Sequence, residues 1–290
     1  MSGDERVDAW RDLAPADLAR AYSPSSMVDS IDAELDVYAA ASDVARARHP
    51  HTEHAYGPGA RQRLDVFHPG DTSPVPVLVF VHGGYWQAET KERACGAVPD
   101  VLAAGAAYVA VEYPLAPEVS LAEIAAECRA ALGWLVEHAA DLGIDPARIH
   151  LAGSSAGAHL AALLTLGDPA DLGPRAEIRS ATLLSGVYDL RPLVGTYVND
   201  PLGLDEPTAW EISPLSRLRA SDAVLVVTWA EHETGEFKRQ SRAFAASWRA
   251  LGNRVEVVPE APGRNHFDLP LDLADPATAL GRAVRGLLHG

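Results

Sequence analysis

Cysteine and lysine are scarce in this chain of 290 residues. The two cysteines, Cys95 and Cys128, cannot build a disulfide framework or a cysteine-based zinc site, and they fit a reducing compartment, so the sequence predicts a cytoplasmic protein. Lys91 and Lys238 are the only lysines, and 24 basic against 40 acidic residues leave a formal charge of −16. Without a basic patch, nucleic acids and acidic membrane surfaces are excluded as partners.

Long apolar runs and cofactor motifs are also missing. No stretch of about 18 apolar residues occurs, and no basic and apolar leader begins the chain, so no membrane association is expected. The G-x-G-x-x-G pattern and a P-loop lysine are absent, which predicts no cofactor. His49, His51 and His54 have a metal-like spacing but lack nearby carboxylates, so we expect solvated loop histidines and no metal. A small-molecule substrate remains by elimination, while the sequence leaves the oligomeric state open, a homodimer included.

Two regions differ in composition. Residues 1–60 hold five arginines against eleven acidic residues, contain several prolines and show no strand-like run. They predict an arm, helical at about 13–20 and 30–48, that packs over a domain formed by residues 61–290. If this acidic arm roofs a site, it disfavours strongly anionic substrates.

The pattern from residue 61 onward alternates between strands and helices, which predicts an α/β fold with a mostly parallel sheet and helices on both faces. Residues 64–66 alternate with polar neighbours, as in a half-buried edge strand. The other expected strands are 75–81, 106–111, 148–152, 180–184, 223–228 and 254–258, and the expected helices are 91–104, 121–140, 156–166, 236–251 and 275–288.

The sharpest local motif is Gly153-Ser154-Ser155-Ala156-Gly157, between a predicted strand and a predicted helix. A serine on such a tight turn projects its hydroxyl above the carboxyl edge of the sheet, so Ser155 is the candidate nucleophile. A Gly/Ser-rich helix cap without catalytic meaning is the alternative.

The second motif is His82-Gly83-Gly84-Tyr85-Trp86, directly after the buried strand 75–81. The backbone N–H groups of Gly83, Gly84 and Ala156 could together stabilise an oxyanion. A plain strand-to-helix turn is the alternative for the two glycines. Two such motifs, in this order and each at a strand end, favour acyl-transfer chemistry.

These motifs and several others resemble the arylformamidases, also called kynurenine formamidases. The further similar segments lie at 22–25, 113–118, 185–190, 236–241 and 266–268, and the segment 113–118 is shared with hormone-sensitive-lipase-like esterases. The resemblance implies an α/β-hydrolase fold with an N-terminal arm covering the site. It also implies hydrolysis of an N-formyl aromatic amide such as N-formylkynurenine, through a serine ester. A carboxylesterase, or a tailoring hydrolase of another aryl ester or amide, is the alternative function.

In α/β-hydrolases the nucleophile precedes the acid and the histidine, so the base lies near the C-terminus. His266 fits this order better than His289, which lies one residue from the chain end. Alignment with the family pattern implies that Glu233 is the triad acid, with Glu231 as the main rival. A non-catalytic binding protein of the same fold is the last alternative, and the complete set of three residues argues against it.

Specificity is expected from two aromatic residues. Tyr85 stands where related esterases carry a third glycine, and Trp86 follows, so both could narrow the acyl side and stack on an aromatic leaving group. Packing under the arm is the alternative for both. The chain also departs from the family pattern at Ser154, often histidine, and at Gly235, commonly proline, and neither departure removes a catalytic group.

Overall fold

A computed structural model describes residues 6–70 and 74–290 of the chain. Its main sheet has eight strands in the order β1-β2-β4-β3-β5-β6-β7-β9, and β8 and β10 form a separate parallel pair. Strands β4, β3, β5, β6, β7 and β9 are parallel, whereas β1 and β2 join antiparallel. The strands are β1 His51–Ala55, β2 Arg63–Phe67, β3 Val75–Val81, β4 Ala107–Val111, β5 Ile144–Ser154, β6 Ile178–Leu184, β7 Val224–Thr228, β8 Ala230–His232, β9 Val255–Val257 and β10 Ala261–Asn265.

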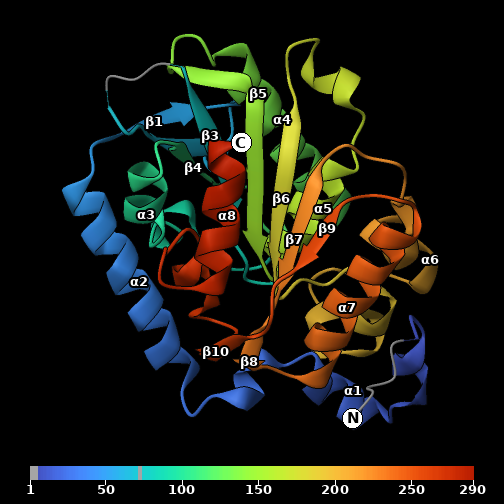
Figure 1. Ribbon diagram of the computed structural model, residues 1–290. Helices are drawn as coiled ribbons and strands as arrows, with labels where there is room; N and C mark the ends of the chain where they lie inside the picture. Colours follow the sequence, from blue (N-terminus) through green and yellow to red (C-terminus); the bar gives the residue numbers. More distant parts are fainter. Residues whose placement is uncertain (1–5, 71–73) are drawn as a thin grey trace.

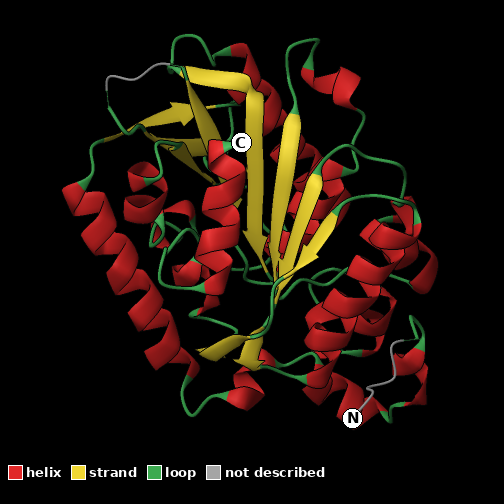
Figure 2. Ribbon diagram, viewed as in Figure 1, coloured by secondary structure: helices red, strands yellow, loops and turns green. Residues whose placement is uncertain are grey.

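Helices cover both faces of the sheet (Figures 1 and 2), which confirms the predicted α/β class. The helices are α1 Pro15–Ala21, α2 Ile31–Arg48, α3 Val98–Ala103, α4 Leu121–Glu137, α5 Ala156–Thr165, α6 Glu206–Glu211, α7 Gly235–Ala250 and α8 Ala279–His289. Short 3-10 helices lie at Ala9–Asp12, Pro24–Met27, Lys91–Arg93, Pro169–Leu172, Arg191–Gly195, Tyr197–Asn199, Pro214–Arg217 and Leu269–Asp272.

Strand β3 contributes side chains to two hydrophobic cores, one on each face of the sheet. Alternate side chains of a strand point to opposite faces. Val77 and Val79 join the core beneath α4, α5 and α7, whereas Leu78 and Phe80 join the core beneath α3 and α8. A strand buried on both faces needs no polar alternation, so the central strands are recognisable as short apolar runs.

The arm contains both predicted helices. Pro15 begins α1, where its missing N–H costs nothing, and the side chain of Ser30 caps α2 by accepting a hydrogen bond from the Ala33 N–H. The segment between the two helices lies at the lower edge of the sheet in Figure 1.

The expectation that no strand precedes residue 60 is wrong. Strand β1 pairs with β2 from His51 opposite Phe67 to Ala55 opposite Arg63, so β1 rather than β2 is the edge strand. Its sequence, His-Thr-Glu-His-Ala, carries no apolar alternation, because much of this edge strand faces solvent. The sheet therefore begins before the predicted boundary at residue 60.

The single helix expected at 91–104 is also wrong. The structure has a 3-10 turn at Lys91–Arg93 and a short helix α3 with Pro99 in its first turn. Proline cannot occupy a helix interior, because it lacks an N–H and its ring clashes with the preceding turn. The apolar periodicity of the segment thus comes from α3 and from the short stretch between the 3-10 turn and α3, which contribute to the same core cluster.

The strand order reverses between β3 and β5, which are neighbours in the sheet. Ligands of open α/β sheets bind at such a switch point, outside the carboxyl ends of the strands. Both sequence motifs follow these two strands, so the topology brings them together.

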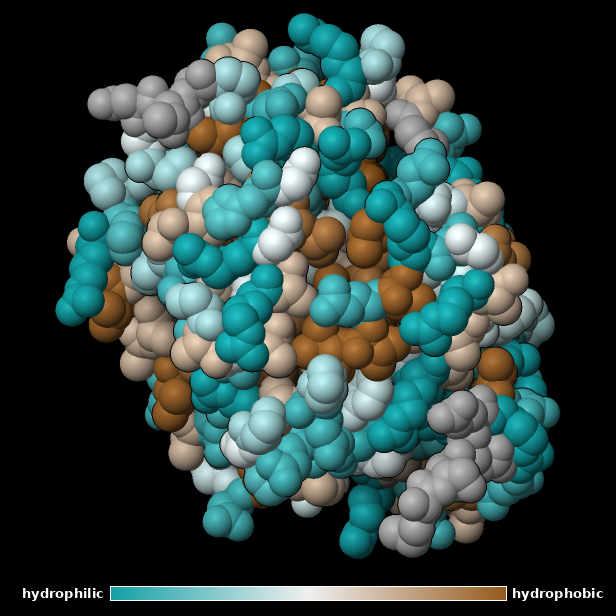
Figure 3. Space-filling view, viewed as in Figure 1, coloured by the Kyte–Doolittle hydropathy of each residue, from teal (hydrophilic) through white to brown (hydrophobic). Residues whose placement is uncertain are grey.

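The face of the molecule drawn in Figure 3 is mostly hydrophilic. Hydrophobic residues gather near the centre of this face, between α8 and α7.

Candidate active site

Ser155 lies on a sharp turn between β5 and α5. Its φ of 57° and ψ of −118° are unfavourable for a residue with a side chain, and its N–H donates to the Leu184 carbonyl at 2.8 Å. A Cβ on Gly153 would collide with the Gly157 carbonyl, and a Cβ on Gly157 would collide with the Val81 carbonyl. Both glycines of the motif are therefore required by close backbone packing, which a simple helix cap would not need.

The loop after β3 lies against this turn. A Cβ on Gly83 would lie 3.0 Å from the Ser154 carbonyl oxygen and 3.3 Å from the Ser155 Cβ, and Gly84 has a φ of +94°. Within the described residues, nothing accepts a hydrogen bond from the N–H of Gly83 or Gly84. Ala156 begins α5, where the first N–H groups have no partner inside the helix. Two of the predicted oxyanion donors, Gly83 and Ala156, thus lie next to Ser155, and Gly84 follows in the same loop.

His266 and Glu233 form a buried pair. His266 follows β10, Glu233 follows β8, and the Nδ1 of His266 is hydrogen-bonded to the Oε1 of Glu233. Their exposed fractions are 6% and 4%. Glu231, the rival acid, is exposed and accepts instead from the Gly263 N–H at 2.7 Å. The geometry separates the two candidates in favour of Glu233.

The sequence interpretation missed Ser185, which holds the second oxygen of Glu233. Its hydroxyl donates to Glu233 Oε2, and its own backbone has a φ of 46° at the end of β6. A serine directly after a buried parallel strand is the available signal, because that position lies at the same edge as the nucleophile. Ser185 restrains the carboxylate so that its other oxygen faces His266.

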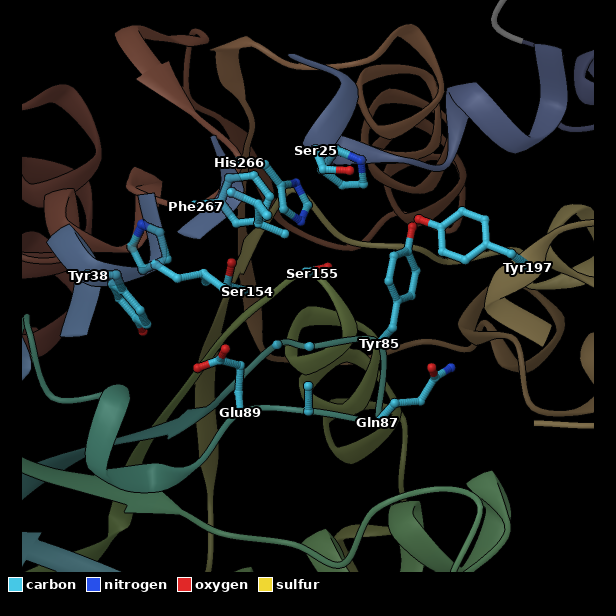
Figure 4. Close-up of a pocket in the computed structure, with 17 residues that line it drawn as sticks. Ser25, Tyr38, Tyr85, Gln87, Glu89, Ser154, Ser155, Tyr197, His266 and Phe267 are labelled. Carbon is cyan, nitrogen blue, oxygen red and sulfur yellow. The ribbon is translucent and has the colours of Figure 1, made fainter. Parts of the chain in front are cut away.

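A cavity of about 280 Å³ lies beside Ser155 and His266. Figure 4 shows Ser155 near the centre, with the ring of His266 above it, Glu89 and Gln87 below, Tyr38 and Ser154 to one side, and Tyr85 and Tyr197 to the other. The residues that line it are Pro24, Ser25, Ile31, Leu35, Tyr38, Gly83, Gly84, Tyr85, Gln87, Ala88, Glu89, Ser154, Ser155, Tyr197, His266, Phe267 and Pro270. Ser155, His266 and the two glycines therefore share one cavity.

The two aromatic residues expected to contact substrate differ. Tyr85 lines the cavity, and its hydroxyl donates to the Tyr22 carbonyl at 2.6 Å. Trp86 is fully buried outside the lining, with its indole packed edge-on against His159 at 5.0 Å. The prediction that Trp86 stacks on the substrate is therefore wrong, because its side chain packs in the hydrophobic core.

The arm is attached beside Glu233 and the first turns of α7. The Ala21 carbonyl accepts from Thr234, next to Glu233, at 2.6 Å. The buried Tyr22 hydroxyl donates to Glu236 and accepts from Gln240, both at 2.8 Å. These contacts place Pro24 and Ser25 in the cavity wall.

The expectation of an acidic roof is wrong in its detail. The arm lines the cavity with Pro24, Ser25, Ile31, Leu35 and Tyr38, none of which is acidic. The acidic residue among the described lining is Glu89, from the loop after β3. Burial, with the charge of nearby Glu89 among the further causes, raises the pKa of Tyr38. None of the described acidic residues of the arm is among the residues that line the cavity.

Two further histidines support the site without reaching the cavity. Burial lowers the pKa of His82 and of His159 to about 4, so both rings are neutral at pH 7. His82 stacks on Tyr113 with ring centres 4.2 Å apart, and its Nδ1 lies 3.0 Å from the Gly83 carbonyl. This contact ties the His82 ring to the glycine loop. His159 bonds to the Ile212 carbonyl at 2.9 Å and packs edge-on against Trp86.

The histidines with metal-like spacing do not converge. His51 stacks on Phe67, whereas His54 packs against Trp134. In the described part of the chain, no group of three or more histidine, cysteine or acidic side chains is arranged to hold a metal. None of the described helices is long and apolar enough to cross a membrane.

Comparisons with known proteins agree on a family of hydrolases. The BD-FAE family profile matches residues 64–176. Kynurenine formamidase of Salmo salar is 30% identical over 93% of this chain and 95% of its own, and that of Danio rerio is 32% identical over 92% and 94%. A solved candidate thioesterase from Silicibacter sp. superposes with a TM-score of 0.77 at 30% identity, covering 92% of this chain and 98% of that one.

Proposed function

The chain belongs to the kynurenine formamidase family of α/β-hydrolases, and from this membership we propose that it removes a formyl group from an aromatic amide of the N-formylkynurenine type. The proposal rests on one observation above all. Ser155, His266 and the glycines of the loop after β3 face one cavity, and His266 is bonded on its far side to Glu233.

Glu233 prepares the base. When its carboxylate accepts the Nδ1–H of His266, the Nε2 lone pair is left free to accept the Ser155 proton. As the proton leaves, Ser155 Oγ forms a bond to the carbonyl carbon of the substrate. The buried carboxylate then stabilises the imidazolium that results.

The oxyanion is stabilised by backbone donors. Negative charge develops on the carbonyl oxygen of the substrate, and the N–H groups of Gly83, Gly84 and Ala156 are its proposed partners. One such donor is worth roughly 10²–10³ in kcat. Because these N–H groups are held by strained loops, they need no reorganisation during the reaction.

The acyl-enzyme forms and is then cleared. His266 donates its proton to the leaving amine as the C–N bond breaks, which leaves a formyl ester on Ser155. A water molecule gives a proton to His266 and adds to the ester carbon. The Ser155 Oγ–carbon bond then breaks, His266 returns the proton to Ser155, and formic acid leaves and ionises to formate by releasing its proton to solvent. Atoms and charges balance without a cofactor.

The shape of the cavity supports a small acyl group. Tyr85 fills the place where a third glycine would leave room, and its ring is fixed by the hydrogen bond to Tyr22. The remaining walls, from Leu35 to Phe267, offer apolar and aromatic surface for an aryl amine. Short aryl esters or thioesters are the second candidate substrates, favoured by the likeness to a candidate thioesterase.

The test compares kcat/KM on N-formylkynurenine, on a short-chain aryl ester and on a long-chain acyl ester. We expect turnover of the first two, with the formamide preferred, and loss of both in Ser155→Ala with the fold intact by circular dichroism. A preference for the long-chain ester, or undiminished activity in Ser155→Ala, would overturn the proposal.

A further inference from the structure

Glu89 places a carboxylate in the cavity wall. Its side chain is only 14% exposed, and its Oε2 is buried without a hydrogen bond, 3.4 Å from the Arg93 Nε. Figure 4 shows Glu89 on the same side of the cavity as Tyr38 and Ser154. A buried carboxylate is costly to leave without donors, because it has lost its water.

The backbone holds this carboxylate in place. Glu89 has a φ of 75°, a left-handed conformation that is unfavourable for any residue with a Cβ. Its carbonyl accepts from Arg61 at 2.8 Å, and its Cγ lies where it would be 3.1 Å from a Cβ on Gly84. The side chain therefore passes directly beside the oxyanion loop, at a fixed position relative to Ser155.

Arg93 leaves part of the Glu89 carboxylate without a hydrogen-bond donor. Its nearest nitrogen to Glu89 is Nε, at 3.4 Å, and it also donates to the Leu35 carbonyl at 3.1 Å. The contact to Oε2 lacks hydrogen-bond geometry, and the other oxygen, Oε1, is not among the fully buried side-chain atoms. A donor entering the cavity thus finds an acceptor beside apolar walls from Ile31, Leu35 and Phe267.

We propose that Glu89 binds a protonated amine on the substrate, so that the enzyme prefers aryl acyl amides whose amine half carries an ammonium group. This inference rests on the proposed function, because it assigns the amine half to the cavity above Ser155. A formyl group occupies little volume, which leaves the rest of the cavity to that half. A hydrogen bond to an ionised partner in a partly dry site is stronger than one between neutral groups.

Binding tests the proposal without turnover. Calorimetry on the Ser155→Ala enzyme compares 3-(aminomethyl)formanilide with its neutral isostere, 3-(hydroxymethyl)formanilide, and with the anionic 3-carboxyformanilide. We expect the ammonium compound to bind about tenfold more tightly than the neutral one, and the carboxylate to bind most weakly. Adding Glu89→Gln should bring the ratio of ammonium to neutral affinity to near one.

Asp36→Asn is the matched control. It removes one negative charge from the exposed side of α2, near the cavity but outside its lining, and should keep the tenfold ratio. Glu89→Gly, which relieves the left-handed backbone, serves as a second variant and should also abolish the ratio. Equal binding of the two compounds, or a ratio that survives both Glu89 substitutions, would overturn the inference.

Turnover by the enzyme with Ser155 separates the two proposals. If no formanilide is hydrolysed but the ratio of affinities depends on Glu89, the proposed function fails and the cation site stands. If the neutral formanilide is hydrolysed and the ammonium compound gains no advantage in kcat/KM, the function stands and the cation site fails.

Discussion

The cavity has two walls that are built in different ways. The sheet-edge wall, made by Gly83, Gly84, Ser155 and His266, follows strand ends and includes backbone conformations that only tight packing can hold. The arm wall, residues 24–38, lies outside the sheet. It is held by side-chain hydrogen bonds, such as those to the neighbouring Ala21 and Tyr22 carbonyls, and it carries the 40% exposed Ile31.

This difference separates chemistry from recognition. Positions fixed by sheet geometry suit reacting groups, which tolerate displacements of well under 1 Å. A surface segment outside the hydrogen-bonded strands, with exposed side chains such as that of Ile31, opens locally at a lower free energy than the central sheet. We therefore expect substitutions in the sheet-edge wall to lower kcat, and substitutions at the arm wall to raise KM.

The largest effect should come from Glu233→Gln. An amide cannot hold His266 in the productive tautomer or stabilise its charged form, so kcat should fall by about 10³–10⁴-fold with little change in KM. Glu231→Gln is the control, since that side chain is exposed and bonds to Gly263. Steady-state kinetics of both variants decides, and similar losses in the two would contradict the assignment of the acid.

The second effect is a pH dependence of the free energy of unfolding, caused by His159 on α5. Burial lowers the pKa of His159 from an ordinary value of 6.5 to about 4 in the folded protein. As the pH falls, this imidazole is therefore protonated in the unfolded chain at a higher pH than in the folded protein. This contribution to stability is present above pH 6.5 and is lost as pH falls toward 4. At pH 5 the loss should be about 2 kcal/mol for this residue.

Urea unfolding of the wild type and of His159→Gln at pH 7.5 and pH 5.0 measures this difference. The wild type should lose about 2 kcal/mol more than the variant, because a glutamine side chain does not titrate in this range. Direct observation of the imidazole by ¹⁵N NMR gives an independent reading, and a charged ring at pH 6 would refute the expectation.

A smaller effect should follow Tyr85→Phe, which breaks a hydrogen bond between the two walls. The Tyr22 carbonyl loses its donor, so the free energy of unfolding should fall by about 1 kcal/mol and KM should rise several-fold, more than kcat falls. Tyr197→Phe is the comparison, since its hydroxyl reaches Ser23 only at 3.3 Å and the residue is 52% exposed. A drop in kcat alone would mean that the arm does not set substrate affinity.

The smallest effect should come from Glu89→Gly. Glycine accepts a φ of 75° freely, and its greater freedom in the unfolded chain offsets part of the gain, so stability should rise by roughly 0.5 kcal/mol. Thermal unfolding should show a melting temperature about 1–2 °C higher. An unchanged or lower melting temperature would show that Glu89 makes stabilising contacts that outweigh its strained backbone.

The same division explains what the sequence could predict. Strands such as β3 and the turns at Gly153–Gly157 follow from local rules, because apolar runs and glycine positions are written in consecutive residues. The pairing of Glu233 with His266 joins residues 33 positions apart. This pair could be predicted only because the sequence resembles a family in which the order of the triad residues is known.

Other features needed the fold itself. Strand β1 has no apolar alternation, and Ser185 reaches Glu233 only because β6 and β7 are neighbours. Trp86 and Tyr85 are consecutive, yet one turns into the core and the other into the cavity, which depends on the left-handed backbone of both. The place of Glu89 in the cavity wall likewise emerges from loop geometry.

The central claim is that Ser155 is a nucleophile activated by His266. Labelling with a fluorophosphonate, followed by intact mass and peptide mapping, tests it most directly. We predict one covalent adduct per chain, located on Ser155, that is absent in Ser155→Ala and forms far more slowly in His266→Ala. Absence of an adduct on the folded enzyme, or an adduct on another residue, would contradict the account.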